Sequence, residues 1–205
     1  MIWFWSFNQK VYNYSTYLMN QSVFLVNRIL AILTVFGQVI GISFLVIFLF
    51  YFLNKKKLKF VKNSIFRKIV KYSYHLALIV SLTATLGSLF YSEIAGFEPC
   101  KLCWFQRILM YPMPLLLSLA IWKKDKSIND YLITLSGIGI VIAFYHYYLQ
   151  RGGQSILPCS TIGYSVSCSN SFVMELGYIT IPLMAATAFL LIIVLMLVPI
   201  LIKEK

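Results

Sequence analysis

Five long apolar stretches constrain this chain more than any other feature of its sequence. They cover residues 29–53, 72–94, 104–122, 131–149 and 178–202. A helix needs roughly 20 mainly apolar residues to cross the hydrocarbon core of a bilayer, and all five stretches are long enough. Composition agrees, because 60% of the 205 residues are hydrophobic and only 12% are charged, which excludes an ordinary soluble domain. The sequence therefore predicts an all-α integral membrane protein.

Lysine and arginine orient the predicted spans. Of the 18 Lys and Arg residues, thirteen follow the first, third or fifth stretch, and five lie on the other side. Cytoplasmic loops retain such residues, so we expect the N-terminus outside and the C-terminus inside. The first 20 residues contain Trp and Tyr but no basic leading segment or small-residue cleavage site. They predict a segment along the bilayer surface rather than a signal peptide.

The net charge of +12 needs no nucleic-acid partner. A basic inner face beside anionic lipid explains it, and the chain contains no recognisable nucleic-acid motif.

The predicted topology places all four cysteines on the outer side or at outer helix ends. They form two pairs, Cys100 with Cys103 and Cys159 with Cys168. Thiols can stay oxidised outside the bacterial cytoplasm, so three roles compete: stabilising disulfides, a zinc site and electron transfer. A stabilising bridge is credible for the second pair. It is a poor explanation for the first, because two intervening residues close too short a loop to constrain much chain entropy.

A Cys-x-x-Cys pair at a helix start favours thiol exchange, because that position lowers the thiol pKa. Four thiolates would match zinc in number, but the wide spacing of the second pair argues against a zinc ribbon.

Pro99 suits a first helical turn. At about 100° per residue, Arg107 then shares a helix face with Cys100 and Cys103. An arginine there can stabilise a thiolate or hydrogen-bond a carbonyl oxygen that gains negative charge, although snorkelling to the interface is the alternative.

His146 and Gln150 lie one turn apart near the outer end of the fourth stretch. Their tyrosine neighbours (Tyr145, Tyr147 and Tyr148) make an interfacial aromatic belt the commoner explanation on the residues alone.

The runs GFEPCKLCWFQRILMYP, FYHYYLQ and GYITIPLMAATAF, together with the two-cysteine loop, resemble the DsbB family of membrane thiol oxidoreductases, and in particular its short-loop BdbC branch. The likeness spans about residues 72–205. Vitamin K epoxide reductases place their Cys-x-x-Cys after the loop cysteines, so the order here argues against them.

The resemblance implies an electron relay in the bacterial plasma (inner) membrane, with both cysteine pairs on the extracytoplasmic side. Its partner would be a DsbA-like thioredoxin-fold thiol oxidase, and its final acceptor a bound quinone, ubiquinone or menaquinone. Carried over, Cys159 forms the mixed disulfide with the partner and Cys168 resolves with Cys100. Cys103 then faces the quinone. Arg107, with His146 and Gln150, would line the quinone site.

The family's usual core is a four-helix transmembrane bundle with both termini inside. We therefore expect residues 72–205 to form that domain, and residues 1–71 to add an interfacial segment, one extra transmembrane helix and a basic cytoplasmic linker. Two other functions stay open. One is a quinone-linked thiol reductase that runs in the opposite direction, and the other is a non-enzymatic membrane scaffold with structural disulfides.

Overall fold

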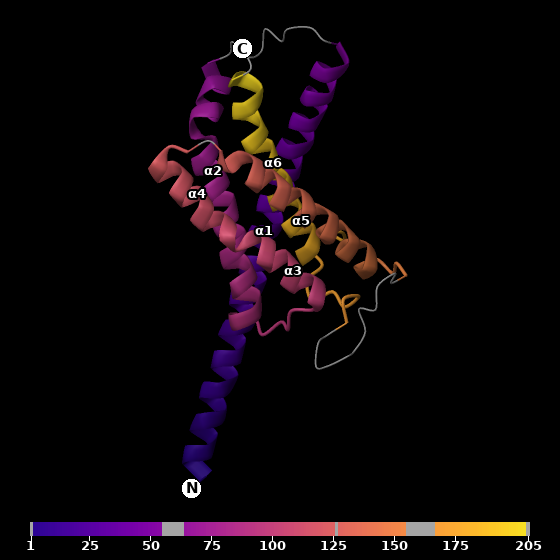
Figure 1. Ribbon diagram of the computed structural model, residues 1–205. Coiled ribbons are helices and arrows are strands. Elements are labelled where there is room, and N and C mark those ends of the chain that lie inside the picture. The colour runs from indigo at the N-terminus through magenta and orange to yellow at the C-terminus, as the bar shows by residue number, and fades with distance from the viewer. Residues whose placement is uncertain (1, 55–63, 126, 155–166, 204–205) are drawn as a thin grey trace.

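The computed structural model describes residues 2–54, 64–125, 127–154 and 167–203, with side chains for 21–47, 71–125, 127–154 and 167–200. Within these ranges the regular elements are helices (Figure 1). They are α1 (Ile2–Asn54), α2 (Ser64–Leu89), the π-helical turn η2 (Phe90–Ile94), α3 (Lys101–Met110), α4 (Pro112–Lys123), α5 (Ile128–Gln150) and α6 (Ile181–Lys203).

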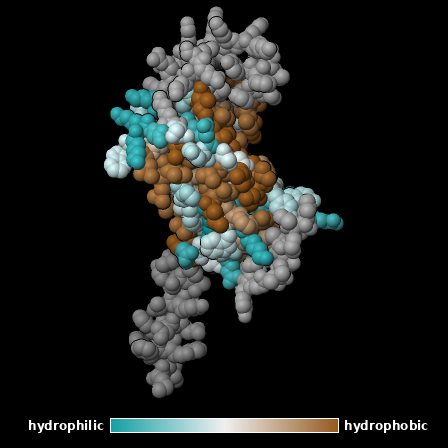
Figure 2. Space-filling view, in the orientation of Figure 1, coloured by the Kyte–Doolittle hydropathy of each residue, from teal (hydrophilic) through white to brown (hydrophobic). Residues whose placement is uncertain are grey.

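Five spans in the described part of the chain are long and apolar enough to cross a membrane, which confirms the predicted all-α membrane fold. They are Gln21–Ile47, Lys71–Ile94, Lys101–Lys123, Ile128–Gln150 and Ile181–Ile200. Figure 2 shows hydrophobic residues across the middle of the bundle and hydrophilic residues towards its two ends. The chain is thus a multi-pass membrane protein whose apolar belt faces lipid.

The N-terminal 20 residues continue helix α1 instead of forming a separate element. The helix runs unbroken from Ile2–Asn54, and its N-terminal end projects beyond the bundle (Figure 1). No glycine or proline precedes Gly37, so nothing in the local sequence interrupts the helix. Placement of these residues along the bilayer surface stays a prediction, and it would require a bend that Figure 1 does not show.

The third predicted span consists of two helices, α3 and α4, that meet at Tyr111. Pro112 begins α4 and Pro114 follows it. Since proline has no backbone N–H and crowds the preceding turn, the two prolines explain why α3 stops at Met110.

The buried core joins α2, α4, α5 and α6. Met113, Leu117, Leu132 and Phe189 are fully buried within it. Gly139 of α5 allows Phe189 of α6 to approach, because an added Cβ would lie 2.5 Å from its Cζ. This core fixes the N-terminal end of α3 beside the C-terminal end of α5, where Cys100 and Cys103 lie.

Candidate active site

Cys100 caps the N-terminus of α3. Its backbone is extended, and its sulfur accepts a hydrogen bond from the backbone N–H of Cys103 at 3.4 Å. Pro99 therefore lies one residue outside the cap, not in the first helical turn as predicted. The cap places the sulfur at the positive end of the helix dipole, which favours a thiolate.

The two sulfurs of the Cys-x-x-Cys pair are in direct contact. Both thiols are free, and their Sγ atoms lie 3.1 Å apart. A disulfide bond is about 2 Å long, so closure requires a movement of about 1 Å. The pair is thus a dithiol poised to become a disulfide.

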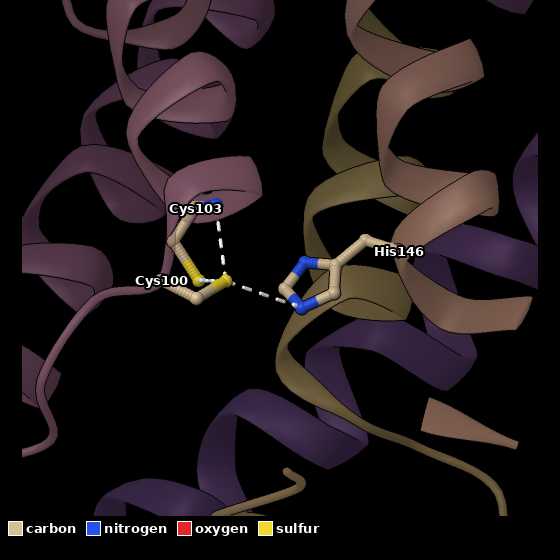
Figure 3. A group of neighbouring side chains, drawn as sticks. All are labelled: Cys100, Cys103 and His146. Carbon is tan, nitrogen blue, oxygen red and sulfur yellow. Dashed lines mark hydrogen bonds between the residues drawn. The ribbon is translucent and has the colours of Figure 1, made fainter. Parts of the chain in front are cut away.

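His146 of α5 faces this pair across the interface between α3 and α5 (Figure 3). Its Nε2 lies 3.5 Å from Cys100 Sγ, and Gln106 Nε2 lies 3.1 Å from its Nδ1. An amide NH₂ only donates, so Nδ1 accepts and the imidazole proton belongs on Nε2. His146 then donates to the Cys100 sulfur and stabilises its thiolate.

The pKa of the Cys100 thiol lies well below its ordinary value. The main cause is the hydrogen bond from the Cys103 thiol; burial opposes it, and the hydrogen bond from His146 lowers the pKa further. The thiolate is the reactive form of cysteine. Cys100 immediately precedes the membrane span. At low pH it is therefore a stronger nucleophile than an ordinary cysteine.

Arg107 lies one turn further into the membrane. Its Nε donates to Ser88 Oγ at 3.0 Å and its Nη2 to Ser88 O at 3.1 Å. The guanidinium also lies over the Trp104 ring, with Cζ 5.4 Å from the centroid. We find no partner for its Nη1 among the described residues. Ser88 thus orients the arginine and leaves one nitrogen available to donate to a ligand.

Cys168 brings the second cysteine pair to the same place. It is buried in one apolar cluster with Cys100, Leu102 and Leu149, and it is disulfide-bonded. Cys159 lies outside the described residues. The structure therefore brings one cysteine of the later pair against the first cysteine of the earlier pair.

A cavity of about 380 Å³ opens beside these groups. Cys103, Arg107, His146 and Gln150 all line it, and the rest of its wall is mainly apolar. Most small-molecule sites have a volume of a few hundred Å³, apolar walls and a few convergent polar groups.

The polar groups of this cavity fit a quinone. Quinones have an apolar ring and tail and two carbonyl oxygens that become hydroxyls on reduction. Arg107 has a free donor nitrogen, and Gln150 has a buried Oε1 without a hydrogen-bond partner in the described part of the chain, while its Nε2 donates to Asn170 O at 3.1 Å. The cavity thus offers a donor for a carbonyl oxygen and an acceptor for a hydroxyl.

Cys100, Cys103 and His146 also lie close enough together for their ligand atoms to contact one metal ion. Their ligand atoms lie within 4.8 Å of one another. Structural zinc sites take four ligands. Cys168 lies nearby, but in a disulfide it supplies no thiolate, and no fourth donor joins the group among the residues described.

Two orienting residues were missed by the sequence reasoning. Gln106 positions His146, and Ser88 positions Arg107. Gln106 left a signal, because it is a polar residue inside an apolar span, three residues after Cys103. Ser88 left none, since small polar residues are common in membrane helices.

Known proteins with similar sequences identify the family of this chain. A family model described as disulfide bond formation protein DsbB matches residues 71–199. The SPbeta prophage-derived disulfide bond formation protein B of Bacillus subtilis is 46% identical over 123 residues, which cover 60% of this chain and 82% of that protein. Disulfide bond formation protein C of the same organism is 44% identical over 120 residues, 58% of this chain and 85% of that protein.

A probable disulfide formation protein of Oceanobacillus iheyensis is 42% identical over 132 residues, 63% of this chain and 91% of that protein. No solved structure matches the chain significantly. The chain belongs to the DsbB family, and its role is in disulfide formation.

Proposed function

We propose that this protein is a thiol:quinone oxidoreductase that generates disulfides by reoxidising an extracytoplasmic thioredoxin-fold dithiol oxidase. The observation that carries the proposal is the convergence of three elements: the Cys-x-x-Cys dithiol, a cysteine of the second pair and a cavity with unused polar atoms. The names of the relatives, which describe disulfide formation, support the oxidative direction.

The relay begins at the loop pair. The partner's thiolate attacks the Cys159–Cys168 disulfide at Cys159 and releases the Cys168 thiolate. The partner's second thiolate then attacks the partner sulfur that is bonded to Cys159. This step leaves the partner oxidised and Cys159 and Cys168 reduced. Two electrons have moved to the loop pair.

The second exchange moves the electrons to the membrane pair. The Cys168 thiolate attacks Cys100 of the Cys100–Cys103 disulfide, and Cys103 leaves as a thiolate. Cys159 then attacks Cys168, re-forms the loop disulfide and releases the Cys100 thiolate. His146 stabilises that leaving thiolate, because its Nε2 faces the sulfur. The free Cys100 and Cys103 thiols and the disulfide-bonded Cys168 match the relay after this exchange.

A quinone, when bound, accepts the two electrons and two protons that the dithiol loses as it becomes a disulfide. Arg107 would donate to a carbonyl oxygen, and Gln150 would accept a hydrogen bond from the reduced form. Cys100 and Cys103 both line the cavity, so the dithiol lies beside the space that would hold the acceptor.

The proposal predicts quinone reduction by purified protein in nanodiscs, driven by a reduced thioredoxin-fold dithiol protein and followed by quinone absorbance. Cys100→Ser and Cys103→Ser should reduce the rate to background with any dithiol. Cys168→Ser is the matched control: it should block electrons from the protein partner but not from a small dithiol that reaches the membrane pair directly. Wild-type rates in Cys103→Ser would overturn the proposal.

A further inference from the structure

Helix α1 lies outside the residues that match the DsbB family model, yet it is packed into the bundle. Gly37 and Gly41 are buried on its inner face. A Cβ on Gly37 would lie 2.9 Å from Leu191 Cδ1, and one on Gly41 would lie 2.9 Å from Leu190 Cδ2. Glycines four residues apart let membrane helices approach closely, so α1 docks directly on α6.

Two polar contacts connect the middle of α1 to the segment that precedes α6. Arg28 Nη1 forms an ion pair with Glu175 Oε2 at 3.2 Å, and Tyr178 Oη donates to Gln38 Oε1 at 3.1 Å. Glu175 and Tyr178 flank a tight turn in which Leu176 and Gly177 have positive φ angles. The turn immediately precedes α6, so α1 is held in register with the segment that follows the loop cysteines.

This docking makes α1 a wall of the cavity that Cys103 and Arg107 line. The α1 lining residues are Leu30, Leu33, Thr34, Phe36, Gly37 and Ile40. From residue 30 to residue 40 a helix rises about 15 Å. The cavity therefore extends from the redox pair along an apolar helix face that runs deeper into the membrane.

We propose that α1 is part of the acceptor site and that its Leu33 and Ile40 contact the apolar tail of the quinone, while α3 and α5 hold the headgroup. The inference rests on the proposed function and assigns to the additional helix a role in tail binding. It separates the two ends of the ligand: polar atoms of the cavity recognise the ring, and α1 recognises the chain attached to it.

Two pairs of neighbouring residues allow a matched test. Leu33 and Ile32 are 51% and 50% exposed, and Ile40 and Val39 are 58% and 59% exposed. Only Leu33 and Ile40 of these line the cavity. Leu33→Trp and Ile40→Trp add bulk to the cavity wall, whereas Ile32→Trp and Val39→Trp add the same bulk elsewhere on the helix.

The measurement is equilibrium binding by calorimetry in detergent micelles, with one quinone that has a single isoprenoid unit and one that has several. We expect Leu33→Trp and Ile40→Trp to weaken binding of the long-tailed quinone by at least about tenfold and of the short one by less than about threefold. Ile32→Trp and Val39→Trp should bind both like the wild type. Thermal unfolding of all four variants checks that they fold.

The outcomes separate the inference from the proposed function. If the wild type binds neither quinone, both fall. In a second outcome the wild type binds quinone but Leu33→Trp and Ile40→Trp have the same affinities as Ile32→Trp and Val39→Trp, either all unchanged or all equally weakened. That result would overturn the role of α1 in tail binding and leave the proposed function standing. An equal loss for short and long quinones in the cavity variants would also overturn tail recognition.

Discussion

Helices α3 and α1 face the same cavity but contribute opposite kinds of side chain. The α3 wall presents Cys103, Gln106 and Arg107, whereas the α1 wall is apolar except for Thr34. One wall therefore provides reactive and charged atoms, and the other provides shape. Changes in α3 should alter chemistry or headgroup affinity sharply, and changes in α1 should alter fit or stability by degrees.

Arg107→Ala should give the largest effect that leaves the cysteines in place. Loss of a hydrogen bond from a charged donor costs about 1.5–3 kcal/mol, so KM for quinone should rise by about 10- to 100-fold. Arg107→Lys keeps the charge without the guanidinium geometry, so its KM for quinone should lie between those of the wild type and Arg107→Ala. Steady-state kinetics measure this, while a chemical oxidant should still close the Cys100–Cys103 bond. An unchanged KM in Arg107→Ala would show that α3 does not recognise the headgroup.

The pH dependence of Cys100 tests the electrostatics of the α3 wall. An ordinary thiol with a pKa of about 8.5 loses about 100-fold of its thiolate between pH 8.5 and pH 6. Because the pKa of Cys100 is lowered, its alkylation by iodoacetamide should change little over this range. Site-resolved mass spectrometry of the reduced protein measures it.

His146→Phe provides the control for that experiment. It removes the hydrogen bond from Nε2, so the Cys100 pKa should rise, and the pH below which alkylation begins to fall should rise by the same amount, about one unit for each 1.4 kcal/mol of lost thiolate stabilisation. If the pH dependence of Cys100 alkylation is the same with and without His146, the histidine does not stabilise the thiolate.

Gly37→Leu tests the packing of the α1 wall. The added side chain would meet Leu191 and Thr187, and overpacking of this kind costs about 1–3 kcal/mol. Gly137→Leu in α5 is the control, since nothing lies within 4 Å of its added Cβ. Thermal unfolding in detergent should show a lower Tm for the first variant alone. Equal Tm values would mean that α1 is not closely docked.

Arg28→Ala should have the smallest effect. The Arg28 side chain is 56% exposed, and exposed ion pairs contribute about 0–1 kcal/mol. We expect a slightly lower Tm for the variant at low salt. In 0.5 M salt, which screens the ion pair, the Tm values of the variant and the wild type should be equal. A decrease of more than about 2 kcal/mol in the free energy of unfolding would show that this ion pair, rather than the glycine face, holds α1 in place.

The local part of the site could be predicted from the sequence, because it depends on a single helix. The shared face of Cys103 and Arg107 follows from helical geometry, and both residues line one cavity in the structure. Even here the prediction misplaced Pro99, since the sulfur of Cys100 serves as the helix cap. The helix break at Tyr111 was also missed, although Pro112 and Pro114 mark it.

The nonlocal part could not be predicted from the residues. Contact between Cys100 and His146 joins positions 46 residues apart, and the family resemblance suggested His146 only as a residue of the quinone site. The docking of α1 was unreadable, because apolar faces of five membrane helices can pair in many orders. What selects one order is close fit, such as Gly37 against Leu191, and fit is a property of two surfaces.

The glycine face of α1 has a consequence for the order of synthesis. Helix α1 is synthesised well before its partner α6, because Gly37 precedes Leu191 by about 150 positions in the chain. Through most of translation Gly37 and Gly41 therefore face lipid or other helices of the nascent chain. The wall that α1 contributes to the cavity can close only after residue 191 has entered the membrane, so a chain that stops before α6 would contain all four cysteines but would lack the α6 face on which α1 docks.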